Sequence, residues 1–93
     1  MKVSRQEFLS ISGLTNEVLD VWLEEEWLIP TESPTEVTFS EVDVARARLI
    51  RDLQQDLGVN TEGVSVILSL LDQLHGMRRT LAELRHNIQA SSD

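Results

Sequence analysis

The sequence predicts a mainly α-helical fold in which a helix-turn-helix and a small β-hairpin precede a long C-terminal helix. Three observations predict it: paired helix-capping patterns near the N-terminus, a turn-rich segment between two β-prone stretches, and a heptad repeat in the last third of the chain. We expect one domain overall, with a winged helix-turn-helix region over residues 1–60, the long helix over residues 61–90 and a disordered tail over residues 91–93.

The helix-turn-helix is predicted from local signals. Ser4 is followed three residues later by Glu7, which is the capping-box pattern, and Gly13 supplies a left-handed residue where this first helix ends. Thr15 caps a second helix that runs to about Trp27. The apolar residues of this helix recur at spacings of three and four: Val18, Leu19, Trp22, Leu23 and Trp27.

The predicted hairpin follows the second helix. Leu28-Ile29 and residues 37–39 are the two expected strands, because both are rich in β-branched or aromatic residues. Residues 30–36 between them include two prolines and several other turn formers. The hairpin therefore has the size and place of the wing of a winged helix.

The third predicted helix begins at Ser40, with Asp43 at its third position. We expect Gly58 to end it and Val59 to contact its last turn. Asn60 or Thr61 then starts the final helix, which runs to about residue 90 and reaches roughly 45 Å at the α-helical rise. The expected apolar stripe of the third helix consists of Val42, Ala45, Leu49, Ile50, Leu53 and Leu57.

The long helix carries an a/d heptad seam of alternating three- and four-residue spacings. A second stripe, Val64, Leu68 and Leu71, lies on another face and stops early, so the first half should pack on the rest of the domain and the second half should not. We predict that the seam joins two copies of the chain; the alternatives are a helix that folds back or a tail that frays. The flanking positions leave parallel and antiparallel pairing open. The seam begins at Ile67, and its predicted dimerisation residues are Leu70, Leu74, Met77, Leu81, Leu84 and Ile88.

Charge is distributed unevenly along the chain. Sixteen acids against eight bases give a formal net charge of −8, and residues 1–43 hold ten of the acids but two of the bases. Such a surface repels nucleic acid and attracts basic protein faces. The alternative is that the acids only keep the domain soluble. The clustered bases are Arg46, Arg48 and Arg51, and Arg48 and Arg51 are interpreted as solvated.

No sequence pattern is typical of an enzyme. Cysteine is absent, which excludes disulfides and thiolate chemistry, and no glycine-rich phosphate loop occurs. His75 and His86 are eleven residues apart on one helix, roughly 16 Å, which is too far to share a metal ion. We expect no catalytic residue, no metal and no cofactor. With no signal pattern and no apolar run of about 18 residues, a cytoplasmic location is the simplest expectation.

The order of the predicted elements resembles that of MerR-type regulators. Residues 39–53 are similar to the third-helix signature of that group, and residues 57–64 to the glycine-containing break before its next helix. The resemblance implies a MerR-like winged helix-turn-helix with a long coiled-coil helix. To read DNA, the second helix should offer Arg, Lys, Asn or Gln to the major groove.

Acids occupy the surface that should meet DNA. Asn16 is the one residue of the required type on the second helix, and the wing carries Glu32 and Glu36 without any base. Like charges against phosphates oppose DNA binding. Trp22 and Trp27 are interpreted as core or core-edge residues, with Trp27 the better candidate for a partly exposed contact. The predicted partner-binding residues are therefore Glu17, Asp20, Glu24, Glu25, Glu26 and Trp27.

This departure is similar to chaperone modulatory proteins of the CbpM type, a MerR-like family that binds protein instead of DNA. The likeness lies in Phe8, the acidic run over residues 24–30, Phe39-Ser40 and residues 67–74. It implies a bacterial, cytoplasmic protein that binds the J-domain of a DnaJ-like, curved-DNA-binding co-chaperone and inhibits its co-chaperone and DNA-binding activities. Two alternatives stay open: a MerR-like transcription regulator with weak or lost DNA binding, and an acidic DNA mimic.

Overall fold

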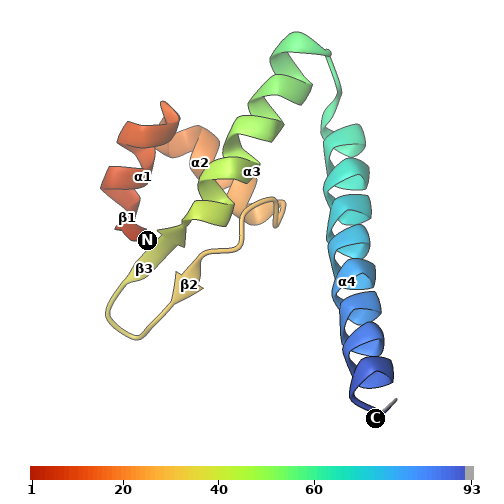
Figure 1. The fold of residues 1–93 in the computed structure, drawn as a ribbon. Helices are drawn as coiled ribbons and strands as arrows, with labels where there is room; N and C mark the ends of the chain where they lie inside the picture. The colour runs from red at the N-terminus through yellow and green to blue at the C-terminus, as the bar shows by residue number, and fades with distance from the viewer. Residues whose placement is uncertain (92–93) are drawn as a thin grey trace.

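The computed structural model describes residues 1–91 as a three-stranded sheet with four α-helices, the last of which is long (Figure 1). The elements in chain order are β1 (Lys2–Ser4), α1 (Arg5–Ser12), α2 (Asn16–Glu24), β2 (Thr31–Glu32), β3 (Val37–Ser40), α3 (Glu41–Arg51), the π-helical turn η1 (Asp52–Asp56) and α4 (Thr61–Ser91). This confirms the predicted fold class. Of the tail predicted to be disordered, Ser91 ends α4, and residues 92 and 93 lie outside the described residues.

The helix-turn-helix forms where the capping patterns predict it. Ser4 and Glu7 make the reciprocal capping box of α1, and Gly13 ends that helix in the left-handed region at φ 74°. The Thr15 side chain accepts a hydrogen bond from the Val18 N–H at the start of α2. Helix α2 stops at Glu24, three residues before the predicted end.

The sheet differs from the predicted hairpin in two ways. Strand β2 lies at Thr31–Glu32 instead of Leu28-Ile29. Leu28 is buried in the core, and the Ile29 N–H donates to Asp43 Oδ1 instead of to a neighbouring strand. Strand β1, which was not predicted, pairs antiparallel with β3 and sets Val3 opposite Phe39. Strand β3 is therefore central, in the order β1-β3-β2.

Helix α3 begins as predicted but buries another face. Asp43 is fully buried: its Oδ1 accepts from the Ile29 N–H at 2.7 Å and its Oδ2 from the Ser40 N–H at 3.1 Å. This anchoring turns Asp43, Ala47 and Ile50 inward. The predicted stripe was therefore wrong at Val42, Ala45 and Leu57, which are exposed. It is confirmed at Ile50 and Leu53, which are buried, and at Leu49, which is partly buried against the core.

The connection to α4 is made by η1 and Gly58. Gly58 has φ 64°, as the prediction of a left-handed end requires, and the Val59 N–H donates to the Leu53 carbonyl at 2.8 Å. The Asn60 side chain then accepts from the Gly63 N–H at 2.8 Å and caps α4. The predicted start of the long helix is confirmed.

One core joins the sheet, the first three α-helices and the beginning of α4. Phe8 and Phe39 stack at its centre with ring centroids 4.4 Å apart. Its buried apolar members are Val3, Phe8, Leu19, Trp22, Trp27, Leu28, Phe39, Ala47, Ile50, Leu53, Val64 and Leu68.

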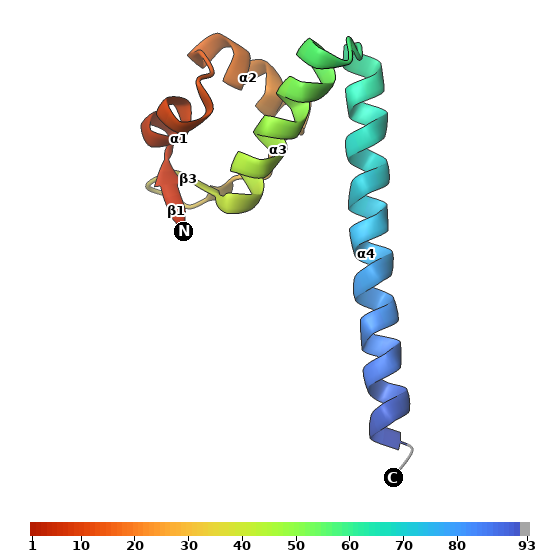
Figure 2. The ribbon, with the colours of Figure 1, turned by 45° about the horizontal axis from the view of Figure 1, so that its top comes forward.

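Helix α4 packs on this core with its first half only. Val64 and Leu68 are buried and Leu71 is partly buried, as the second stripe predicted. The helix has 31 residues and runs well past the other elements, which Figure 2 shows from a second direction. The molecule accordingly measures 55 × 35 × 19 Å along its principal axes.

Candidate protein-binding surface

Helix α2 presents an apolar side to the core and an acidic side to solvent. Leu19 and Trp22 are buried, whereas Glu17, Asp20 and Glu24 are all exposed. The acids are three and four residues apart, a spacing that aligns side chains along one face of a helix. The predicted acidic face is thus present on the second helix of the helix-turn-helix.

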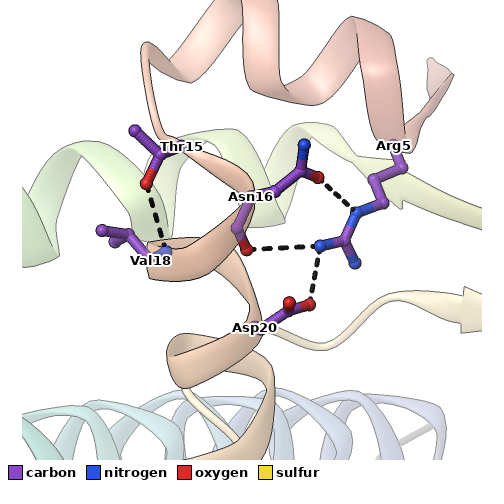
Figure 3. A network of polar contacts seen from close by, with 5 residues as sticks. All are labelled: Arg5, Thr15, Asn16, Val18 and Asp20. Carbon is purple, nitrogen blue, oxygen red and sulfur yellow. Dashed lines mark hydrogen bonds and ion pairs between the residues drawn. The ribbon is translucent and has the colours of Figure 1, made fainter.

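Asp20 differs from the other acids because an arginine neutralises it. The Arg5 guanidinium reaches from the start of α1 to Asp20 Oδ1 at 2.6 Å (Figure 3). The same side chain donates through Nε to Asn16 Oδ1 at 3.1 Å and through a terminal nitrogen to the Asn16 carbonyl. The ion pair of Asp20 with Arg5 therefore connects α2 to α1, and Asn16 is hydrogen-bonded to the same arginine.

Three consecutive glutamates form the end of α2. Glu24 is its last residue, Glu25 is the C-cap, and Glu26 follows in the left-handed region at φ 61°. All three side chains are exposed. Acids at a helix C-terminus lie against the negative end of the helix dipole, so the local negative potential is larger than three carboxylates alone would give.

Most of this acidic surface carries no compensating charge. The ion pairs found within residues 1–91 join Glu41 to the N-terminal amine, Arg5 to Asp20 and Arg46 to Asp72. Glu17 and the three glutamates at the end of α2 take part in none of them. Residues 6–45 contain no Lys or Arg at all.

Trp27 belongs to the core and not to the predicted partner-binding surface. Only 2% of it is exposed, its ring lies 6.0 Å from that of Trp22, and its indole N–H donates to Ser65 Oγ on α4 at 2.9 Å. The Arg46 Nε donates to the Trp27 carbonyl at 2.7 Å. Trp27 thus connects the segment that follows the three glutamates to α4.

The clustered arginines of α3 are mostly used internally. Arg46 connects the Trp27 carbonyl with Asp72 of α4, to which it donates at 2.7 Å. Arg51 donates to the Ser12 carbonyl at the end of α1. Only Arg48 is exposed. The interpretation of Arg48 and Arg51 as solvated was wrong for Arg51, because the end of α1 lies against it.

The wing adds acids next to α2. Glu32 and Glu36 are exposed on either side of the hairpin turn, which Ser33 closes by hydrogen bonds with the backbone of Glu36. The elements that would face a duplex in a winged helix-turn-helix are therefore negative in both parts, α2 and the wing.

The seam of α4 is a separate exposed apolar surface. Its predicted residues are between 42% and 67% exposed: Leu70, Leu74, Met77, Leu81, Leu84 and Ile88. Ile67, where the seam begins, is partly buried against the core. His75 and His86, which flank the seam, are both exposed.

Comparison with known families assigns the chain. The family model described as MerR HTH family regulatory protein matches residues 3–86. The chain belongs to this MerR family. No curated protein and no solved structure matches the chain. The match covers the helix-turn-helix, the wing and most of α4, so the acidic face of α2 occupies the position where a DNA-reading MerR protein needs hydrogen-bond donors.

Within residues 1–91, no three His, Asp or Glu side chains gather closely enough to hold a metal ion. Among the helices described, none combines the length and apolar character that crossing a bilayer demands.

Proposed function

We propose that this MerR-family chain binds the J-domain of a DnaJ-like, curved-DNA-binding co-chaperone and inhibits the co-chaperone and DNA-binding activities of that protein. The observation that carries the proposal is the uncompensated acidic surface of Glu17, Glu24, Glu25 and Glu26 in the place where relatives contact DNA. The likeness of the sequence to CbpM-type chaperone modulators supplies the identity of the partner. No catalytic group takes part in this function.

The proposed mechanism is occlusion. A J-domain carries a basic helix that the Hsp70 chaperone recognises, and a negative surface is complementary to it. Attraction between unlike surfaces speeds the encounter and selects the partner against acidic competitors. While the modulator covers the basic helix, Hsp70 cannot reach it.

The exposed seam of α4 is suited to pair with a second copy of the chain. Leu74, Met77, Leu81 and Leu84 are exposed along one seam of α4, beyond the part of the helix that packs on its own domain. Fully burying each such side chain contributes roughly 1.5–3 kcal/mol relative to leaving it in water. Pairing with the same seam of a second copy supplies that burial, so we propose a homodimer.

Family membership also favours a second candidate, a transcription regulator that has lost direct DNA binding. Such a protein would act through a basic partner, for example a subunit of the transcription machinery. The acidic surface suits that role equally well, and the identity of the protein captured by the chain separates the two candidates.

Calorimetric titration of the purified chain with an isolated J-domain tests the proposal. The variant Glu24→Lys/Glu25→Lys/Glu26→Lys should bind about tenfold more weakly or worse, and its affinity should depend less on salt. Glu83→Lys, an exposed charge reversal on α4, is the control and should leave the affinity unchanged. If the triple variant binds as the native chain does, the acidic end of α2 is not the binding surface.

A further inference from the structure

A hollow of about 560 Å³ lies between the end of α2 and the wing. Its apolar floor includes Leu23, Ile29, Pro30 and Val37. Ile29 is 59% exposed and Val37 39% exposed, although both are β-branched residues that favour burial. An apolar floor that faces water beside the acidic surface is a feature of a docking groove.

The charges around this groove do not balance. Arg5 and Asp72 also line it, but Arg5 is paired with Asp20 and Asp72 with Arg46. The remaining charged groups are Glu26 at the end of α2 and Glu32 on the wing. Neither takes part in an ion pair within residues 1–91. The net charge of the rim is therefore negative, while the floor is apolar.

The wing is poorly suited to bind an extended peptide by strand addition. Its edge strand β2 has two residues, so it can offer very few ladder hydrogen bonds. Pro30 directly before it and Pro34 in the turn have no N–H to donate. An occupant that satisfies its own backbone hydrogen bonds, namely a helix, fits this groove better.

We propose that the groove between α2 and the wing binds an amphipathic basic helix of a protein partner. Apolar side chains on one face of that helix pack on Ile29 and Val37, and Lys or Arg residues beside them pair with Glu26 and Glu32. That this helix is the basic helix of the J-domain rests on the proposed function. In the groove, apolar contacts and the wing contribute to binding along with the acidic end of α2.

A second apolar hollow argues for this location by contrast. It has a volume of about 600 Å³ and lies between α3 and the first half of α4, with Val42, Leu49 and Leu71 in its lining. Arg79 stands at its rim, and the Asp72 that also lines it is paired with Arg46. A basic helix would meet like charge at this second hollow, so the rim charges favour the groove between α2 and the wing as its binding site.

Two matched pairs of variants test the groove. Glu32→Lys should weaken binding of the J-domain about tenfold at low salt, whereas Glu36→Lys, on the same wing but outside the groove, should change it little. Val37→Thr should weaken binding several-fold at both low and high salt, because it removes apolar contact and not charge. Val42→Thr in the second hollow is its control.

The titrations are repeated with a synthetic helical peptide of lysine and leucine, so that the groove and the proposed function are tested separately. If the chain binds the J-domain and none of the groove variants weakens that binding, the groove proposal is wrong and the proposed function stands. If the chain ignores the J-domain but binds the peptide in a way that Glu32→Lys weakens, the groove stands and the proposed function falls. If the chain binds neither ligand, both proposals fall.

Discussion

At the scale of single residues, Asp43 has the most consequential placement. It is the one fully buried acid in the described core. Its carboxylate accepts hydrogen bonds from two backbone N–H groups, one in the loop after α2 and one at the start of α3. The carboxylate therefore joins the helix-turn-helix to the hairpin. The sequence predicts the capping contact of Asp43, but not the contact with Ile29, which lies 14 residues away.

Replacing Asp43 with alanine should destabilise the fold by about 1–3 kcal/mol, because the Ile29 and Ser40 N–H groups both lose the carboxylate that accepts from them. Urea unfolding followed by circular dichroism measures this change. Glu41→Ala, two residues earlier and exposed, is the control and should cost less than about 1 kcal/mol. Equal losses in the two variants would mean that Asp43 does not hold the hairpin.

Glu26 is a residue whose conformation works against stability. A non-glycine residue in the left-handed region costs roughly 1–2 kcal/mol, so Glu26→Gly should raise the free energy of unfolding by about 1 kcal/mol. The same substitution should weaken J-domain binding, since it removes a rim charge. Glu25→Gly, at φ −77°, should instead lower stability. A Glu26→Gly protein that is less stable than the native chain would contradict the strained geometry.

At the scale of elements, the sequence predicts best what local contacts decide. Ser4, Thr15 and Ser40 cap helices through neighbours three residues away, and all three helix starts are confirmed. Non-local contacts decide the rest. Strand β1 exists through its pairing with β3, and Trp27 is buried because α4 returns to meet it 38 residues later. The buried face of α3 likewise depends on which helices flank it.

The exposed seam of α4 is the proposed dimer interface, and a charge placed in it should prevent pairing. Leu81→Glu should convert the proposed dimer into a monomer and reduce the helical signal of the distal half of α4, because a charge in the seam opposes pairing. The core should stay folded, since Leu81 is 63% exposed and lies beyond it. Ala82→Glu, one residue away and off the seam, should remain a dimer. Sedimentation equilibrium measures the oligomeric state of both variants. A dimeric Leu81→Glu protein would exclude this seam as the dimer interface.

At the scale of the whole molecule, charge is separated along the long axis. Residues 1–60 hold twelve acids and five bases, whereas residues 75–90 hold three arginines and one acid. Parallel pairing would set two acidic lobes at the same end, and antiparallel pairing would place each acidic lobe beside the basic end of its partner. We therefore expect antiparallel pairing, most strongly at low salt.

Introduced cysteines test this orientation, because the native sequence has none. Antiparallel overlap of the seam on itself sets Leu74 opposite Leu84. An equimolar mixture of Leu74→Cys and Leu84→Cys should therefore form covalent dimers on oxidation, while each variant alone should not. Covalent dimers of Leu74→Cys alone would indicate a parallel pair instead.

We propose that the face which a winged helix-turn-helix presses onto DNA is, in this chain, a negative face that binds a basic protein. Fluorescence anisotropy at low salt, with labelled duplex DNA in one titration and a labelled J-domain in the other, tests it most directly. We expect saturable binding of the J-domain that added salt weakens, and no change in the anisotropy of the duplex. Tight binding of the duplex together with no binding of the J-domain would contradict it.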